Sequence, residues 1–148
     1  FLRPLAWALA TDLSFGALAQ AEVNAKRLGL SNRASFGRSD WFEAVDGRFD
    51  LIVSNPPYIP AADMAALAAE LSYAPEAALT DGRDGLSAYR AIFTAAAPFL
   101  APGGRILVEF GAGQAADVAT IARDAGWEDS SFRADLDGRE RALLVQTR

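Results

Sequence analysis

Asn55, Pro56, Pro57 and Tyr58 follow directly after the apolar run Phe49–Ser54, and their types and order suit them to chemistry. Two consecutive prolines fix φ as the backbone leaves the predicted strand, so the carbonyls of Asn55 and Pro56 are held rigid. An asparagine side-chain oxygen and a nearby backbone carbonyl can together accept both hydrogens of one planar NH2 group. Tyr58 supplies a flat face for the rest of that group. The segment therefore predicts a site for an amide or for the exocyclic amine of a base.

Attack by an amide nitrogen on a methyl group has specific requirements. The nitrogen is a poor nucleophile because its lone pair is delocalised. Fixing both N–H bonds orients it, and a separation of ~3–3.5 Å from an electrophilic methyl gives a near-attack arrangement. Positive charge then builds on the nitrogen, where carbonyl dipoles stabilise it. The alternative is that Asn-Pro-Pro-Tyr is only a strand-ending turn, although its position directly after Phe49–Ser54 argues against this.

Composition excludes several other kinds of chemistry. The 148 residues include no cysteine and no histidine, which excludes disulfides, thiolate nucleophiles, Ser-His-Asp triads and cysteine- or histidine-ligated metals. We therefore expect no metal. The formal net charge of -5 disfavours a nucleic-acid substrate without excluding a local basic groove.

Neither end of the chain shows a membrane or export signal. No apolar run approaches the ~18 residues of a membrane span, and the N-terminus lacks a signal-peptide pattern. Together with the lack of cysteine, this predicts a cytoplasmic protein without membrane contact. Phe1 is not a start methionine, which indicates that the chain was cut or trimmed at this end.

Apolar runs and helical stretches alternate along the chain without a repeat or a dividing linker, so we expect one domain over residues 1–148. Ser14 is predicted to cap a helix that stops at Gly29. The expected strands cover residues 6–11, 33–37, 49–54, 105–110, 127–134 and 141–146. The other expected helices cover residues 63–71, 87–100 and 114–125.

This alternation predicts an α/β fold with a mostly parallel sheet covered on both faces. The last two strands, joined by a short turn at residues 137–138, predict an antiparallel hairpin at one edge. Residues 102–104, Pro-Gly-Gly, predict a turn ahead of the fourth strand. Ligands in such folds bind beyond the carboxyl ends of the strands. That rule selects three places, which are Asp12, residues 55–58 and residues 109–111.

The segment FDLIVSNPPYIP, residues 49–60, resembles motif IV of amino-methyltransferases, and its extended form is similar to the HemK/PrmC family. NPPY alone is shared with DNA adenine and rRNA guanine methyltransferases. Its combination with SDWF at residues 39–42 and DGL at residues 84–86 is more specific to the glutamine enzymes. Further similar positions are residues 10–14, 17–18, 24–25, 75, 78–79, 89, 92, 102–104 and 109–111.

Members of that family methylate the glutamine amide in the Gly-Gly-Gln loop of class I peptide-chain release factors. The resemblance therefore implies a Rossmann-like class I methyltransferase sheet and S-adenosylmethionine (SAM) as the methyl donor. It also implies a release factor as the protein partner, with no direct nucleic-acid binding.

The resemblance implies cofactor-binding roles for residues at two strand ends. Asp12 is placed to accept hydrogen bonds from both ribose hydroxyls, with Leu13 beside it. The alternative for Asp12 is helix capping next to Ser14. Asp40 and Trp41 would flank the adenine, with the carboxylate near its amino group, and the alternative for Trp41 is a place in the core.

The resemblance also implies the catalytic and substrate-binding residues. Asn55 would hold the substrate amide and lie near the donor methyl, with Pro56 and Tyr58 also catalytic. Pro57 would complete the substrate-binding segment, and Tyr58 would pack on the substrate side chain. Glu109 lies at a suitable strand end, but its alternative role is an ion pair with a nearby arginine.

The chain departs from the family in two respects. Members carry a glycine-rich loop of the DxGxGxG type after a first strand, usually preceded by a helical substrate-docking domain, and this sequence contains none of these. Residues 111–113 are its only glycine-spaced run, and we interpret them as the turn after a later strand. We therefore expect a sheet that lacks its first strand and binds cofactor weakly or not at all. The second departure is Ala74, with Glu76 after Pro75, where relatives usually place an acid before the proline.

Three hypotheses for function remain open on the sequence. The first is a glutamine methyltransferase acting on release factors. The second is a nucleic-acid amino-methyltransferase that shares NPPY and should show a basic substrate face. The third is a degenerate, non-catalytic module that binds a partner through the same pocket, and the missing glycine-rich loop is its best support.

Overall fold

The computed structural model describes residues 3–66 and 74–146. Contacts divide the chain into two compact units, Phe1–Asp46 and Gly47–Arg148. The single domain expected over residues 1–148 stays a prediction. Within the described ranges, no helix is both long and apolar enough to cross a lipid bilayer.

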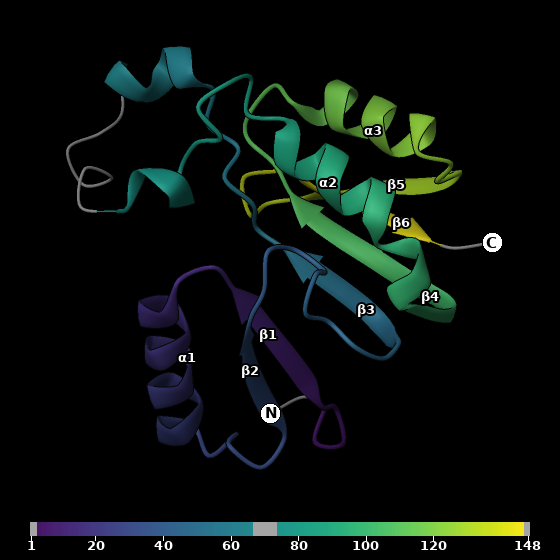
Figure 1. Cartoon of the computed structure of the whole chain (residues 1–148). Helices are drawn as coiled ribbons and strands as arrows, with labels where there is room; N and C mark the ends of the chain where they lie inside the picture. The colour runs from purple at the N-terminus through teal and green to yellow at the C-terminus, as the bar shows by residue number, and fades with distance from the viewer. Residues whose placement is uncertain (1–2, 67–73, 147–148) are drawn as a thin grey trace. The chain divides into compact units, whose positions relative to one another are not determined.

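The first unit is a β-α-β arrangement. Strand β1 (Ala8–Asp12) pairs in parallel with β2 (Ala34–Arg38), and helix α1 (Phe15–Arg27) connects them. A parallel pair needs such a crossover connection. Helix α1 lies alongside both strands (Figure 1) and buries Leu18 and Ala25. The two expected strands are confirmed to within two residues.

The predicted ends of α1 are confirmed. The Ser14 Oγ atom accepts a hydrogen bond from the Ala17 amide at 3.2 Å and so caps the helix. Gly29 follows the last turn with φ of +68°, a left-handed conformation that glycine adopts without penalty. Asp12, at the end of β1, is thereby held immediately ahead of a capped helix.

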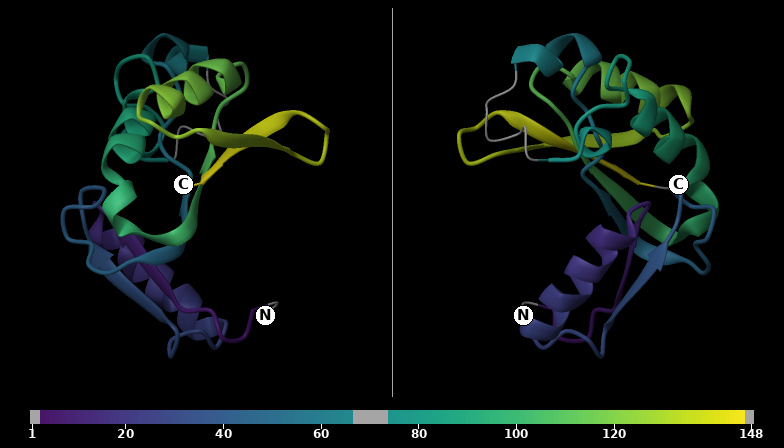
Figure 2. Two further views of the ribbon diagram at one scale, coloured as in Figure 1. Left: turned by 90° about the vertical axis from the view of Figure 1, so that its right-hand side faces the viewer. Right: turned by 60° about the vertical axis from the view of Figure 1, so that its left-hand side comes forward.

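The second unit contains a four-stranded sheet in the order β3-β4-β6-β5 (Figures 1 and 2). Strands β3 and β4 pair in parallel, whereas β6 pairs antiparallel with both β4 and β5, which confirms the C-terminal hairpin. The regular elements of this unit, in chain order, are β3 (Phe49–Ser54), α2 (Ser87–Ala95), β4 (Leu100–Glu109), α3 (Ala115–Asp124), β5 (Asp129–Ala134) and β6 (Glu140–Gln146). Among the described residues of this unit, short 3₁₀ helices cover Ala61–Ala66, Glu76–Ala78 and Ala97–Phe99.

Helices α2 and α3 pack side by side on this sheet (Figure 2). Strands β4 and β6 bury alternate residues, Ile106, Val108, Leu143 and Val145, as expected for strands with one covered face. In the same register, Val53 and Leu107 share the opposite face. Val53 is 64 % exposed, so within this unit the sheet is covered on one face.

Aromatic side chains form the centre of the core. Tyr89 and Phe93 of α2 and Phe110 after β4 are fully buried. The Trp127 ring packs on Phe93, with ring centroids 6.4 Å apart, and its buried Nε1–H donates to the Phe93 carbonyl at 2.9 Å. The core therefore anchors α2 and the end of β4, which border the candidate site.

Three predictions of local structure differ from the structure. The helix expected over residues 87–100 ends at Ala95, because Pro98 lacks an amide hydrogen and its ring clashes with the preceding turn. Residues 102–104, expected as a turn ahead of the strand, lie within β4. The pairing register with β3 shifts there, since Leu100 pairs with Phe49 and Arg105 pairs with Leu51. The helix expected over residues 63–71 is a 3₁₀ helix as far as Ala66, and residues 67–71 lie outside the described ranges.

Candidate functional site

Residues 55–58 lie directly beyond the carboxyl end of β3, as predicted from the sequence. Asn55 is exposed, Pro56 is buried and Tyr58 is partly buried. Among residues 3–66 and 74–146, no group forms a hydrogen bond with the Asn55 carboxamide or the Pro56 carbonyl. Within these ranges, both oxygens therefore keep unused capacity to accept hydrogen bonds.

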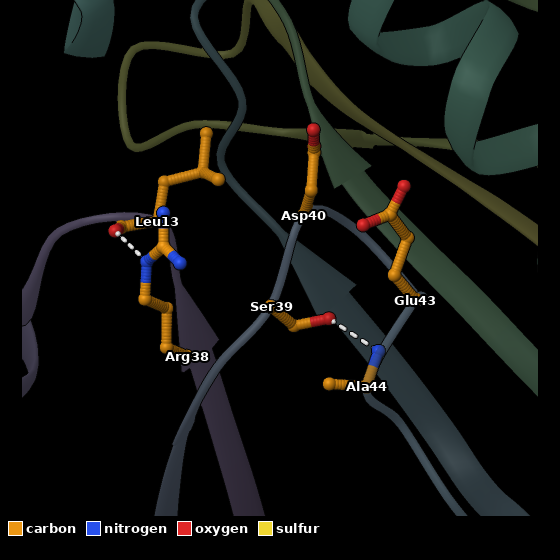
Figure 3. Close-up of a pocket in the computed structure, with 6 residues that line it drawn as sticks. All are labelled: Leu13, Arg38, Ser39, Asp40, Glu43 and Ala44. Carbon is orange, nitrogen blue, oxygen red and sulfur yellow. Dashed lines mark hydrogen bonds between the residues drawn. The ribbon is translucent and has the colours of Figure 1, made fainter.

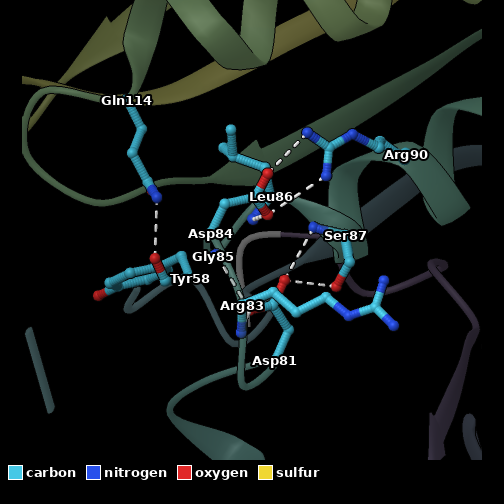
Figure 4. Close-up of polar contacts among 9 residues, drawn as sticks. All are labelled: Tyr58, Asp81, Arg83, Asp84, Gly85, Leu86, Ser87, Arg90 and Gln114. Carbon is cyan, nitrogen blue, oxygen red and sulfur yellow. Dashed lines mark hydrogen bonds and ion pairs between the residues drawn. The ribbon is translucent and has the colours of Figure 1, made fainter. Parts of the chain in front are cut away.

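The chain immediately after these oxygens is fixed by hydrogen bonds to other segments. The Tyr58 carbonyl accepts from Gln114 Nε2 at 2.8 Å (Figure 4). The Ile59 amide donates to the Leu79 carbonyl, and the Ala61 amide donates to the Arg83 carbonyl, each at 2.9 Å. Segments far apart in sequence thus hold one side of the Asn-Pro-Pro-Tyr motif in place.

Asp81 organises the loop that supports the motif (Figure 4). Its Oδ1 atom accepts from the amides of Arg83 and Gly85 at 2.8 and 3.0 Å. Its Oδ2 atom accepts from the Ser87 amide at 3.0 Å and from the Ser87 hydroxyl at 2.6 Å. One carboxylate therefore connects the turn that supports Ala61 to the start of α2.

These hydrogen bonds also set the ionisation of Asp81. Burial on its own would raise the pKa of this carboxyl, but the donors from Ser87, Arg83 and Gly85 outweigh it and hold the pKa far below its usual range. A carboxyl whose pKa falls on folding adds stability above its unfolded pKa, and that stability is lost as the pH drops below that value.

Replacement of Asp81 by asparagine is expected to flatten the acid side of the stability profile. At neutral pH the variant should be less stable by about 1–3 kcal/mol, because an amide NH2 would face the Ser87 donors. Between about pH 5 and pH 3 the wild type should lose stability more steeply than D81N, since only the wild type has this carboxyl to protonate. Urea unfolding at a series of pH values measures both effects, and parallel profiles for the two proteins would contradict this role.

The Tyr89 side chain of α2 meets Glu109 at the end of β4. The Tyr89 hydroxyl donates to the Glu109 carbonyl at 2.9 Å. Burial, with smaller contributions from Tyr58 and Glu109, raises the pKa of Tyr89, so its hydroxyl stays a neutral donor. The described residues show no ion pair between Glu109 and an arginine, and Arg141 instead pairs with Asp135 at 3.5 Å. The proposed alternative role of Glu109 therefore has no support among the described contacts.

The first unit has a pocket of about 410 Å³ beside the carboxyl ends of β1 and β2 (Figure 3). This volume is within the range of small-molecule sites. Asp40 and Glu43 point to the same side of their segment in Figure 3, so the pocket carries two carboxylates. Its lining residues are Leu13, Arg38, Ser39, Asp40, Glu43 and Ala44.

Hydrogen bonds fix the ends of β1 and β2 around this pocket. The Arg38 Nε atom donates to the Leu13 carbonyl at 3.1 Å, and its guanidinium lies 5.2 Å from the centre of the Phe15 ring. Asp12 Oδ1 accepts from the Ser14 amide at 2.7 Å. Asp12 therefore uses one oxygen at the helix start, which leaves the other for the ribose role inferred above.

Trp41 is the only non-glycine residue among those described with a positive φ, +47°. Such a conformation is strained for a bulky side chain and persists only where neighbours enforce it. Ser39 enforces it here, since its hydroxyl donates to the Trp41 carbonyl and accepts from the Ala44 amide, both at 3.0 Å. Trp41 is 37 % exposed, which does not support the alternative place in the core.

The predicted residues fall into two groups, one in each unit. Leu13 and Asp40 line the pocket of the first unit, whereas Asp12 and Trp41 border it in sequence without lining it. The second unit holds the other four, Asn55, Pro56, Pro57 and Tyr58, as one continuous segment beyond β3.

Two residues of this site do not stand out from the sequence. In the sequence, Gln114 is only the first residue of an expected helix. Its hydrogen bond to the Tyr58 carbonyl joins two residues that are 56 positions apart in the sequence. Asp81 precedes a glycine, a pair that marks turns, and this is the signal that could have found it.

A known protein family matches the part of the chain that carries both groups of predicted residues. The family model described as the methyltransferase small domain matches residues 3–85. The chain belongs to the methyltransferase small domain family. The matched residues include the β-α-β unit with its pocket and the whole Asn-Pro-Pro-Tyr motif, and they end at Gly85, which lies against the Tyr58 carbonyl.

Curated relatives share a more specific name. The chain is 53 % identical over 145 residues to the release factor glutamine methyltransferase of Cereibacter sphaeroides, covering 97 % of this chain and 52 % of that protein. It is 48 % identical over 147 residues to that of Rhodospirillum rubrum, covering 99 % of this chain and 45 % of the relative. The corresponding protein of Moorella thermoacetica is 39 % identical, with coverage of 98 % and 52 %. The chain spans about half the length of these relatives.

Solved structures show that the fold is that of methyltransferases. A methyltransferase from Pyrococcus furiosus matches with a TM-score of 0.67 at 16 % identity, covering 95 % of this chain and 62 % of that one. The hMettl16 catalytic domain in complex with a MAT2A 3'UTR hairpin matches with a TM-score of 0.70 at 14 % identity, covering 94 % and 55 %. At these identities the matches establish the mixed α/β fold alone.

Proposed function

We propose that this protein transfers a methyl group from SAM to the side-chain amide nitrogen of the glutamine in the Gly-Gly-Gln loop of a class I release factor. The observation that carries the proposal is the pair of oxygens on Asn55 and Pro56, which have no hydrogen-bond partner among the described residues. They lie beyond β3 and are backed by a loop that hydrogen bonds hold in place. The names of the curated relatives support the same substrate.

The pocket of the first unit fits the nucleoside part of SAM. Ribose hydroxyls and the adenine amino group are hydrogen-bond donors, and carboxylates are acceptors. Asp40 and Glu43 supply such acceptors in the pocket, and Asp12 supplies another at the end of β1. When bound, SAM supplies an electrophilic methyl group.

The residues of the motif prepare the glutamine nitrogen for attack. The Asn55 Oδ1 atom and the Pro56 carbonyl each accept one amide N–H, which orients the nitrogen lone pair. Both dipoles would stabilise the positive charge that develops as the N–C bond forms and the S–C bond of the bound sulfonium donor breaks. Tyr58 would pack on the substrate side chain, and the nitrogen would then release one proton to water to give the neutral methylamide.

A nucleic-acid amino-methyltransferase is the second candidate, since its substrate amine is also planar. The likeness to an RNA-bound catalytic domain is a likeness of fold. The formal net charge of -5 disfavours a polyanionic substrate. A release factor as substrate would place the protein in the cytoplasm, without direct nucleic-acid binding.

Substitution of Asp12 tests the cofactor half of the proposal. In D12N the side-chain oxygen can still accept from the Ser14 amide, but the carboxylate charge is lost and an NH2 group replaces one acceptor. We expect SAM affinity to fall at least ~10-fold, or about 1.4 kcal/mol. The matched control is S14A, which removes the helix cap and should cost about 1 kcal/mol of stability with little change in affinity. Titration calorimetry at the protein's natural length measures this, and equal affinities for D12N and wild type would rule out the ribose role.

The acceptor half is tested by competition between substrates. The protein, labelled SAM, an unmodified release factor, and samples of DNA and RNA are combined, and the label in each fraction is counted. We expect label in the release factor only. Label in the nucleic acid would support the second candidate, and label in neither fraction would favour a non-catalytic binding module.

A further inference from the structure

Gln114 occupies an unusual position for a buried polar side chain. It is the N-cap residue of α3 but makes no side-chain hydrogen bond to that helix, and it is 9 % exposed. Residues at this position usually cap the helix with their own side chain. Gln114 instead directs its carboxamide away from α3, toward the Tyr58 carbonyl (Figure 4).

The two partners of Gln114 require a carboxamide. Its Oε1 atom accepts from the Gly111 amide at 2.8 Å, and its Nε2 atom donates to the Tyr58 carbonyl at 2.8 Å. One partner can only donate and the other can only accept, so the partners themselves fix the orientation of the amide. Of the side chains of this length, neither a carboxylate nor an apolar chain satisfies both partners.

Close backbone approach leaves this bridge little room to adjust. A Cβ atom at Gly111 would lie 2.9 Å from Gln114 Oε1 and 3.1 Å from Tyr58 Cδ2. A Cβ atom at Gly85 would overlap the Tyr58 carbonyl oxygen and lie 3.1 Å from Gln114 Nε2. Glycines therefore allow the loops after β3 and β4 and the loop before α2 to meet at one carbonyl.

We propose that Gln114 is a positioning residue for methyl transfer, because its carboxamide fixes the peptide plane after Tyr58 and so the orientation of the Asn-Pro-Pro-Tyr motif. This inference rests on the proposed function. The prolines fix φ at Pro56 and Pro57 but leave ψ free. The bond from Gln114 holds the carbonyl side of the peptide plane after Tyr58, whose amide side is held by the bond from Ile59 to the Leu79 carbonyl. It also occupies a carbonyl that would otherwise compete for the substrate N–H groups.

Loss of the Gln114 bridge should affect the rate of methyl transfer rather than the binding of SAM or substrate. A misplacement of about 1 Å in a reacting group can lower the rate about 100-fold. Gln114 lies in the second unit and lines no part of the pocket in the first unit. Its loss should therefore lower kcat while leaving SAM affinity and the KM for the release factor nearly unchanged.

The test compares Q114M with a matched control on the same helix, V118A, in the protein at its natural length. The methionine side chain in Q114M would keep the chain length and lose both hydrogen bonds, whereas V118A removes buried core volume from α3 without touching the motif. Steady-state kinetics with a release factor, SAM titration and thermal melts are measured for each, at a temperature where both are folded. We expect kcat to fall ~10–100-fold in Q114M, with KM within about twofold, and to stay within about twofold in V118A.

Each outcome has a separate meaning. Turnover by Q114M within about twofold of wild type, or a loss matched by V118A at equal stability, would overturn the positioning role alone. An inactive wild type would overturn the proposed function and this inference with it. If Q114M does not fold, Q114N replaces it in the test. Its shorter side chain keeps the polar carboxamide but cannot reach both the Gly111 amide and the Tyr58 carbonyl. The same selective loss of kcat is therefore expected.

Discussion

Replacement of Asn55 by alanine is expected to lower kcat for methyl transfer by about 100- to 1,000-fold, the usual effect of removing one preorganised group that stabilises transition-state charge. The side-chain oxygen would no longer accept a substrate N–H or stabilise the positive nitrogen. The effect on SAM affinity should be far smaller.

The fold should tolerate this substitution. Asn55 is exposed, and its carboxamide bonds to no described residue, so the stability change should stay within about 0.5 kcal/mol. Single-turnover kinetics under saturating SAM, with melting curves alongside, measure both. D50N is the matched control, because Asp50 is also exposed, lies on the strand that leads into the motif and is outside the motif. A kcat for N55A close to that of D50N would show that Asn55 is only part of a strand-ending turn.

Replacement of Gly85 by alanine is expected to cause the largest loss of stability at the site, about 3 kcal/mol or more. Gly85 has φ of +74°, which strains any residue with a Cβ by roughly 1–2 kcal/mol. Its Cβ would in addition overlap the Tyr58 carbonyl oxygen and lie 2.9 Å from the carbonyl carbon, and overpacking of this kind costs about 1–3 kcal/mol more. Because backbone must move, activity should fall as well.

Gly82 provides the control for this substitution. It has a nearly equal φ of +72°, but a Cβ atom added there would meet no other atom within 4 Å. G82A should therefore show the conformational strain alone, about 1–2 kcal/mol, with turnover unchanged. Urea unfolding and kinetics of both variants separate strain from overlap. Equal losses in the free energy of unfolding for G82A and G85A would mean that the overlap with the Tyr58 carbonyl does not contribute to the effect of G85A.

Local patterns are enough to predict the elements that carry the motif. The apolar run of β3 followed by two prolines predicts both the strand and its end, because both effects act within a few residues. The Ser14 cap and the C-terminal hairpin are local in the same sense. The end of α2 differs from its prediction because Pro98 stops the helix within an otherwise periodic segment.

The supports of the motif could not be predicted in this way. Gln114 acts on a carbonyl 56 positions away, and no local pattern encodes such a partner. Asp81 gathers donors from residues 83, 85 and 87, which only a closed loop brings together. The strained conformation of Trp41 likewise depends on Ser39. The Ser39 hydroxyl forms hydrogen bonds with the Trp41 carbonyl and the Ala44 amide, and only the folded structure reveals them. The sequence thus identifies the groups that would contact a substrate, and the folded loops supply their restraints.

The peptide-level mass spectrum of a release factor treated with the protein and SAM tests the central claim most directly. We expect a gain of one methyl group on the glutamine of the Gly-Gly-Gln peptide, absent when N55A replaces the wild type. An unmodified glutamine after incubation with wild-type protein that demonstrably binds SAM, or a methyl group on another residue, would contradict it.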